Sequence, residues 1–179
     1  MATVPPLLVM CMVLFLKWKT EVFSTLLESL LVLLYLAVIP ALAYILQPLI
    51  PALRHKGRSG QRTLAMILSV VGYLAGVITG YAMKVGSEVQ LIYNTYLLSV
   101  IVLVLFNCFH IRASGHACSV AGPLIFLCVY GHYFIIPVCI LIAVAVVWSS
   151  LVLKRHTVKD MIFGAAVSTL SFVCMNAIL

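Results

Sequence analysis

Residues 132–152 read HYFIIPVCILIAVAVVWSSLV, and none of these 21 positions holds Asp, Glu, Lys or Arg. At about 1.5 Å rise per residue, an α-helix of this length extends for about 30 Å, the thickness of the hydrocarbon core of a bilayer. A strand of a membrane barrel would alternate apolar and polar residues, and this stretch does not. The stretch therefore predicts a transmembrane helix.

The rest of the chain has the same character. Of its 179 residues, 65% are apolar and 8% are charged, and the mean hydropathy is +1.24. A soluble domain carries about 25% charged residues to cover its surface, so the composition excludes this class. We expect one all-α integral membrane domain over residues 22–179, with six transmembrane helices at residues 22–46, 63–83, 90–110, 115–131, 132–152 and 159–179.

The first 21 residues differ from these six segments. Residues 4–16 are apolar but too short to cross a bilayer, and Lys17, Trp18 and Lys19 follow them. Lysine and tryptophan are typical of the membrane interface. The segment lacks the basic beginning and the small-residue cleavage site of a signal peptide. We therefore expect residues 1–21 to form a short interfacial segment of the mature protein.

Polar stretches between the spans decide which residues can meet. Two spans separate residues 47–62 from residues 111–114, and two more separate these from residues 154–160, so all three stretches emerge on one membrane face. This face carries eight Lys and Arg residues, and the opposite face carries three. Such an excess of cations predicts that this is the cytoplasmic face of a multi-pass protein of the cell membrane. The net charge of +7 favours anionic lipids or phosphorylated substrates as partners over nucleic acid. The opposite face carries Lys17, Lys19 and Lys84, whereas this face carries Arg54, Lys56, Arg58, Arg62, Arg112, Lys154, Arg155 and Lys159.

Some residues within the spans predict packing. Gly72, Gly76 and Gly80 form a flat strip on one helix face, suited to close contact with another helix of the same chain or with a second copy in a homodimer. The six cysteines form no C-x-x-C pair, so we interpret them as small apolar residues and expect no metal or cofactor. Glu28 comes early in its span, and we expect its side chain to reach out to water.

Two short motifs lie on the cation-rich face. Ser114, Gly115 and His116 begin a span, where free backbone amides and the helix dipole favour an anion such as phosphate. His156 and Asp160 are four residues apart, which would place them on one helix face and let the carboxylate orient the imidazole as a nucleophile. Each motif has a plainer alternative, because Ser114 and Asp160 are also typical helix-capping residues.

Together, the motifs resemble those of the type 2 phosphatidic acid phosphatase superfamily. That family carries K-x6-R-P, then P-S-G-H, then S-R-x5-H-x3-D. Here Ser114-Gly115-His116 is followed by Ser149-x6-His156-x3-Asp160, with two spans between them and a basic stretch upstream. The resemblance covers residues 56–160.

The resemblance implies a metal-independent lipid phosphatase that acts through a phosphohistidine. His156 would attack the phosphorus, Asp160 would orient it, and His116 would protonate the leaving oxygen and then activate water. The substrates implied are phosphatidic acid, phosphatidylglycerophosphate or a polyprenyl diphosphate. The residues implied in binding the phosphate are Lys56, Arg58, Arg62, Ser114, Gly115 and Arg155.

The sequence departs from the family pattern at three places. Ala113 replaces a proline, the first motif is incomplete around Lys56 and Arg62, and Ser150 replaces a phosphate-binding arginine. Arg112 and Arg155 are candidates to replace that arginine. Two alternative functions follow: a catalytically silent relative that binds phospholipid head groups, or a small transporter or structural membrane protein. The second is disfavoured because ionisable residues cluster at the span ends.

Overall fold

The computed structural model describes residues 4–153 and 156–179, except for the side chain of residue 58. This part of the chain is helical throughout, without strands. The long helices are joined by short turns, two of which contain 3₁₀ segments. In chain order the elements are α1 (Val4–Lys19), α2 (Leu26–Leu33), the π-helix η1 (Leu34–Val38), α3 (Ile39–Leu46), η2 (Gln47–Leu49), α4 (Pro51–Arg54), α5 (Gly57–Met83), α6 (Ser87–Cys108), α7 (Gly115–Tyr130), η3 (Tyr133–Ile135), α8 (Ile136–Val152) and α9 (Val158–Ile178).

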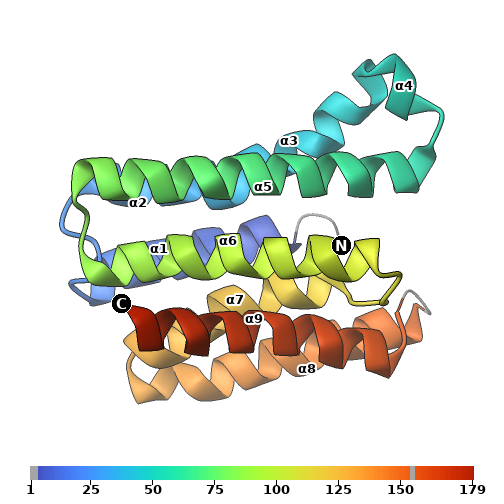
Figure 1. Ribbon diagram of the computed structural model, residues 1–179. Helices are drawn as coiled ribbons and strands as arrows, with labels where there is room; N and C mark the ends of the chain where they lie inside the picture. Colours follow the sequence, from blue (N-terminus) through green and yellow to red (C-terminus); the bar gives the residue numbers. More distant parts are fainter. Residues whose placement is uncertain (1–3, 154–155) are drawn as a thin grey trace.

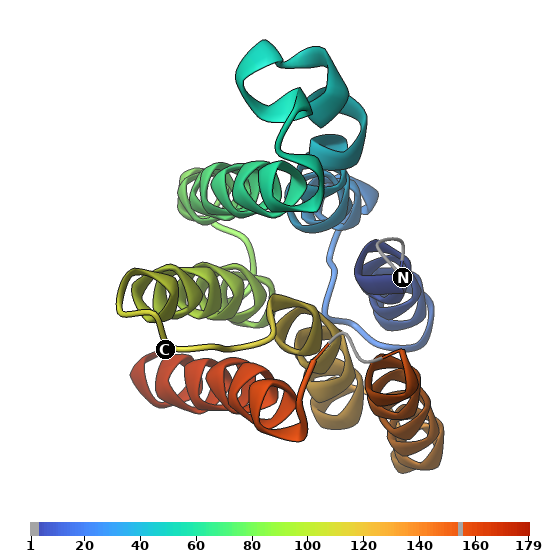
Figure 2. The ribbon, with the colours of Figure 1, turned by 90° about the vertical axis from the view of Figure 1, so that its right-hand side faces the viewer.

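The helices form a bundle whose long axes run roughly parallel or antiparallel (Figure 1). Seen from one end, α5 pairs with the segment from α2 to α3, α6 and α1 lie in the next layer, and α9 and α8 lie furthest from α5 (Figure 2). The short helix α7 lies in the interior, where it packs against α1, α8 and α9. The described part of the chain therefore buries its motif-bearing helix α7 among the others.

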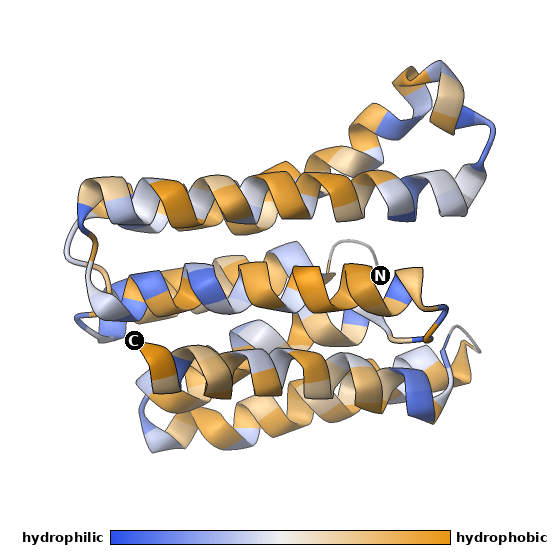
Figure 3. Ribbon diagram, viewed as in Figure 1, coloured by the Kyte–Doolittle hydropathy of each residue, from blue (hydrophilic) through white to orange (hydrophobic). Residues whose placement is uncertain are grey.

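Five helices are long and apolar enough to cross a membrane: Leu26–Leu49, Ser59–Met83, Ser87–Cys108, Tyr133–Val152 and Val158–Ile178, among the described residues. Hydrophobic residues cover their middle sections, and hydrophilic residues gather towards their ends (Figure 3). The chain is thus a multi-pass membrane protein. The sixth expected span is the helix α7, whose 16 residues extend for only about 24 Å.

The helix α1 is a packed member of the bundle. Its residues Leu8, Val9, Met12, Val13 and Leu16 are buried in the core, and the helix contacts α2 and α7. Apolar contacts of this kind hold α1 against the other helices. The structure does not confirm a separate interfacial segment at residues 1–21.

The glycine strip of α5 contacts other helices of the same chain. A Cβ atom at Gly72 would lie 2.8 Å from the carbonyl oxygen of Tyr35, and one at Gly76 would lie 2.6 Å from the ring of Tyr93. One at Gly80 would collide with the side-chain oxygen of Gln90. The strip is therefore an intramolecular packing groove for η1 and α6, and a homodimer through it stays an untested alternative.

The π-helix η1 widens the first long span just before Pro40. A proline inside a helix lacks an N–H and its ring crowds the carbonyl four residues earlier, here that of Leu36. A π-helical turn is one way to relieve this crowding. Leu36 and Pro40 both line the large cavity described below, so the irregular turn faces the candidate site.

The turns gather at two ends of the bundle. We call the end with the α4–α5 turn, residues 109–114 and residues 156–160 the cationic end, and the end with residues 20–25, 84–86 and 131–132 the opposite end (Figure 1). A backbone hydrogen bond of 2.9 Å from Ser114 N to Asp160 O joins two of the turns at the cationic end. The described parts of the three polar stretches that the sequence places on one membrane face thus lie at one end of the bundle.

Candidate functional site

The turn from α6 to α7 begins with a left-handed residue. The amide of Ile111 donates to the carbonyl of Phe106 at 2.8 Å, and the amide of His110 donates to that of Asn107 at 3.2 Å. This is the Schellman pattern of helix ends, in which the residue at the position of His110 is usually glycine. The φ angle of His110 is 58°. The cap turns the chain so that His110, Ile111 and Arg112 line two neighbouring pockets.

The first turn of α7 is capped by Ser114. Its hydroxyl oxygen accepts a hydrogen bond from the amide of Ala117 at 3.2 Å, and the residue is fully buried. In this conformation the Ser114 hydroxyl caps the helix, which agrees with the alternative that Ser114 is a capping residue. Gly115 is exposed, and a Cβ atom there would meet nothing within 4 Å. The space beside the start of α7 is therefore open to a ligand.

The start of α9 corrects one sequence prediction. Thr157 is the N-cap of the helix, and it forms a capping box with Asp160: the Thr157 amide donates to Asp160 Oδ2 at 3.0 Å, and the Asp160 amide donates to Thr157 Oγ1 at 3.2 Å. His156 therefore lies before the helix, and the prediction that His156 and Asp160 share one helix face is wrong. The chain turn before α9 still brings His156 within electrostatic range of the Asp160 carboxylate.

Close packing fixes the two motifs relative to each other. A Cβ atom at Gly164 of α9 would collide with the carbonyl oxygen of Ser114 and lie 3.0 Å from the Cβ of Ala117. Only a glycine at this position lets α9 approach the start of α7 so closely. This contact and the hydrogen bond from Ser114 to Asp160 hold the two motifs side by side.

A cavity of about 930 Å³ opens at the cationic end, between α1, η1, α3, α5, α6, α7 and α9. Its volume is within the range of sites for small ligands. His116 and His156 are half-buried in its lining, whereas Arg62 and Arg112 are exposed. The candidate residues that line it are Arg62, Gly115, His116, His156 and Asp160.

The structure does not bring every candidate residue to this cavity. Lys56 is exposed at the start of α5 and is not among the described lining residues, and Ser114 is buried without lining the cavity. Arg155 and the side chain of Arg58 lie outside the described residues. Ser150, at the family's arginine position, is 1% exposed on α8, and its hydroxyl has no hydrogen-bond partner in the described part of the chain.

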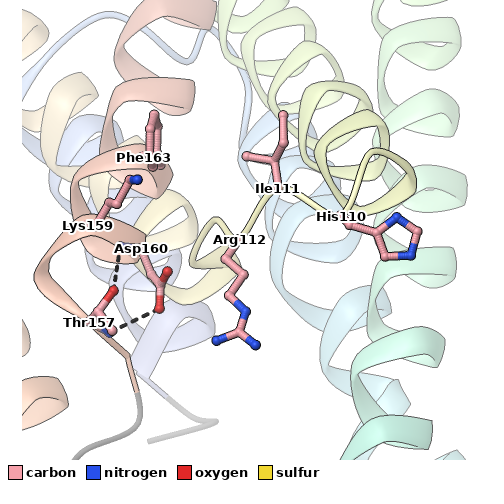
Figure 4. A pocket seen from close by; sticks show the side chains of 7 residues that line it. All are labelled: His110, Ile111, Arg112, Thr157, Lys159, Asp160 and Phe163. Atoms are coloured by element: carbon pink, nitrogen blue, oxygen red, sulfur yellow. Dashed lines mark hydrogen bonds between the residues drawn. The ribbon is translucent and has the colours of Figure 1, made fainter.

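A smaller pocket of about 480 Å³ shares lining residues with the large cavity. Figure 4 shows the side chains that line this smaller pocket. Arg112 and Lys159 contribute cations to it, and Asp160 contributes its carboxylate, which lies within electrostatic range of Arg112. The ammonium group of Lys159 also lies 5.9 Å from the ring centre of Phe163, a cation–π distance. Both pockets share His110, Ile111, Arg112 and Asp160, so they form one polar region.

Sequence reasoning missed the polar residues that α6 contributes to the cavity. Tyr96, Ser99 and Asn107 line it, together with Val100 and Leu103. These positions follow the spacing of one helix face, so a polar stripe was visible within an otherwise apolar span. The loop residue His110 was also missed, and a left-handed histidine has no clear signal in a single sequence.

Cysteines and other metal-binding side chains form no metal centre in the part of the chain that the structure describes. All six cysteines are free thiols, and Cys118 and Cys139 are buried. The residues that the structure describes contain no group of three or more His, Cys, Asp or Glu side chains placed to hold an ion.

Comparisons of the chain with models of protein families, with curated proteins and with solved structures found no match.

Proposed function

We propose that the protein is an integral-membrane phosphatase that hydrolyses a phosphomonoester or diphosphate of a lipid, such as phosphatidic acid, phosphatidylglycerophosphate or a polyprenyl diphosphate. One observation carries the proposal: the same cavity combines three histidines, two arginines and an aspartate with a largely apolar interior. A phosphorylated head group complements these charges, and a lipid tail complements the interior.

In the first chemical step, an imidazole nitrogen of His156 attacks phosphorus, and the bond from phosphorus to the lipid oxygen breaks. His116 donates a proton to the leaving oxygen, so a phosphomonoester leaves as the lipid alcohol and a diphosphate leaves as the lipid monophosphate. Arg62 and Arg112 stabilise the negative charge that gathers on the phosphoryl oxygens. The carboxylate of Asp160 stabilises the positive charge that His156 acquires, since the two groups lie within electrostatic range.

In the second step, His116 accepts a proton from water, and the water oxygen attacks phosphorus. The bond from phosphorus to the nitrogen of His156 breaks, and inorganic phosphate leaves. Every step uses side chains that line the same cavity. The cation excess of this end further predicts that the reaction takes place at the cytoplasmic face of the cell membrane.

The test is phosphate release by the purified full chain in detergent, from a panel of lipid phosphates and without added divalent metal. His156→Ala should lower the rate by at least about a thousandfold, because removal of a nucleophile abolishes the covalent step. His116→Ala should still accumulate a phosphoenzyme that is stable in base and labile in acid, if the substrate carries a good leaving group.

His55→Ala is the matched control. His55 is exposed at the same end, accepts a hydrogen bond from Arg54 Nε at 3.1 Å, and is not among the described residues of the cavity. Its substitution should leave phosphate release unchanged. Undiminished release by His156→Ala would remove the proposed nucleophile, and parent protein that releases phosphate from none of the lipids would contradict the proposed function.

A second candidate function is a silent relative that binds phospholipid head groups. The observation that favours it is Ser150, a buried residue without charge where the resembling family has a phosphate-binding arginine. A missing charge-assisted contact costs transition-state stabilisation while leaving Arg62 and Arg112 to bind the head group. Binding of phosphatidic acid vesicles by parent protein that releases no phosphate would favour this candidate.

A further inference from the structure

The lining of the cavity contains two buried hydroxyl groups that lack a strong hydrogen-bond partner among the described residues. Tyr96 and Ser99 of α6 are 5% and 6% exposed, and both line the cavity. Among the described residues the Tyr96 OH has no hydrogen-bond partner, and the Ser99 Oγ meets only the thiol of Cys118, which is a weak donor and acceptor. A buried polar group without a partner destabilises the fold, so these groups point to a partner that the chain does not supply.

Other polar groups surround these two hydroxyls. Cys118 lies beside Ser99 and Ser168, and both serine side chains line the cavity. A Cβ atom at Gly122 would lie 3.1 Å from the Tyr96 OH and 3.4 Å from the Ser168 Oγ, so the absence of a side chain there leaves room beside both hydroxyls. The rings of Tyr73 and Tyr96 pack edge to face at 5.4 Å, which fixes the direction of the phenol.

This hydroxyl cluster, Tyr96, Ser99 and Ser168, lies deeper in the bundle than the charged residues. Cys118 and Gly122, which lie next to it, follow Gly115 by three and seven residues along α7. At about 1.5 Å rise per residue, these positions lie about 5 to 10 Å beyond the start of the helix. Apolar side chains also line the cavity, among them Leu36, Met66 and Leu103, and the Tyr73 ring packs against Tyr96. A ligand that reaches from the histidines to the cluster must combine polar atoms and hydrocarbon.

We propose that Tyr96 and Ser99 determine substrate specificity by donating hydrogen bonds to the acyl ester carbonyls of a glycerol-based lipid phosphate. This inference rests on the proposed function. In such a lipid, carbonyl oxygens follow the phosphate after only a few bonds, and the acyl chains begin directly after them. A polyprenyl diphosphate has hydrocarbon at this position, so its binding would bury both hydroxyls without acceptors.

The decisive ligands are phosphatidic acid with two ester-linked chains and its analogue with two ether-linked chains of equal length. They share the phosphate, the glycerol and the tails, and they differ only in the carbonyl acceptors. Polyprenyl phosphate serves as the third ligand. Two measurements are made on the full chain in detergent: kcat/KM for phosphate release, and thermal stabilisation of the protein by each lipid.

The parent should prefer the ester lipid over the ether lipid by about tenfold or more in kcat/KM, and the ester lipid should stabilise it more. Tyr96→Phe and Ser99→Ala should each bring the ratio of kcat/KM for the ester lipid to that for the ether lipid closer to one. The kcat/KM for the ether lipid itself should change little. Thr95→Val is the matched control, because Thr95 is also buried on α6 with a hydroxyl that has no partner in the described part of the chain, but it does not line the cavity. Its ratio should equal that of the parent.

The outcomes separate this inference from the proposed function. Equal phosphate release from the ester and ether lipids, or a preference for polyprenyl phosphate, would overturn the inference and leave the phosphatase intact. Preferential stabilisation by the ester lipid without phosphate release from any lipid would support the inference for a binding protein and overturn the enzyme. Equal stabilisation by ester and ether lipids without phosphate release would overturn both.

Discussion

The two ends of the bundle use the same capping box for different surroundings. At the opposite end, Glu28 accepts hydrogen bonds from the amides of Ser24 and Thr25 at 2.8 and 3.4 Å, and the Glu28 amide donates to Thr25 Oγ1 at 3.2 Å. At the cationic end, Thr157 and Asp160 form the same motif. Glu28 is 9% exposed and borders neither pocket, whereas Asp160 lines both pockets beside Arg112 and His156.

The left-handed helix caps repeat this contrast. Lys84 ends α5 with φ of 52°, and the amide of Val85 donates to the carbonyl of Gly80 at 3.1 Å. His110 occupies the equivalent position after α6, with φ of 58°. Both residues accept a conformation that glycine adopts at lower cost. His110 lines both pockets, whereas Lys84 lines neither.

These pairs teach that capping explains why a residue is present but not what else it does. Asp160 and Glu28 satisfy orphan amides in the same way, so the hydrogen bonds of the cap cannot distinguish a structural carboxylate from a functional one. The difference lies in the neighbours: Asp160 has cations and histidines around a cavity, whereas Glu28 caps a turn that borders neither pocket. Each prediction below compares two residues that share a local role.

The largest expected difference is between Asp160→Asn and Glu28→Gln. Each substitution removes a capping charge and should cost about 1 kcal/mol of stability. Asp160→Asn should also lower phosphate release by at least about a hundredfold, because the positive charge that develops on His156 loses its counter-ion. Glu28→Gln should keep the parent's rate. Thermal unfolding and phosphate release, measured on both variants, check this; equal rates for the two would reduce Asp160 to a cap.

The positions of the long helices followed from the sequence because run length and charge decide which segments can lie in lipid. The number of spans between them also predicted that the motifs of residues 114–116 and 156–160 lie at the same end of the bundle. One prediction at Asp160 was wrong. The four-residue spacing suggested that His156 and Asp160 share one helix face, but the signature Thr157-x-x-Asp160 is that of a capping box and indicates that α9 begins at Val158. The expectation that Glu28 reaches water is wrong for the same reason, since Thr25-x-x-Glu28 is a capping box.

The depth of the cavity could not be predicted from one sequence. Ser99 and Tyr96 face it only because α6, α7 and α9 meet at Gly122 and Gly164, and such contacts join residues far apart in the chain. The burial of Ser150 likewise depends on packing rather than on its place in a motif. Periodicity shows that a helix has a polar stripe, but not which neighbour the stripe meets.

An intermediate difference is expected between Gly164→Ala and Gly80→Ala. At Gly164 the new methyl group meets the backbone carbonyl of Ser114, which the start of α7 holds in place, whereas at Gly80 it meets the flexible tip of Gln90. Gly164→Ala should therefore cost about 1–3 kcal/mol and slow phosphate release, because it separates the two motifs. Gly80→Ala should cost less and leave the rate unchanged. A smaller loss of stability for Gly164→Ala than for Gly80→Ala would show that the start of α7 is not rigidly packed.

The smallest expected effect concerns the two left-handed caps. His110→Gly and Lys84→Gly should each raise stability by about 0.5–1 kcal/mol, because glycine adopts positive φ without the steric penalty of a side chain and loses part of that gain to backbone entropy. The shared gain, measured as a shift of thermal or chemical unfolding in detergent, tests whether both caps store strain.

The two variants should differ in a second measurement, the KM for the lipid phosphate. Because the His110 imidazole lines the pockets that hold Arg112 and Asp160, His110→Gly should raise KM for the lipid phosphate severalfold, whereas Lys84→Gly should not. If His110→Gly gains stability and keeps the parent's KM, the left-handed histidine serves only the turn, and the site begins at Arg112.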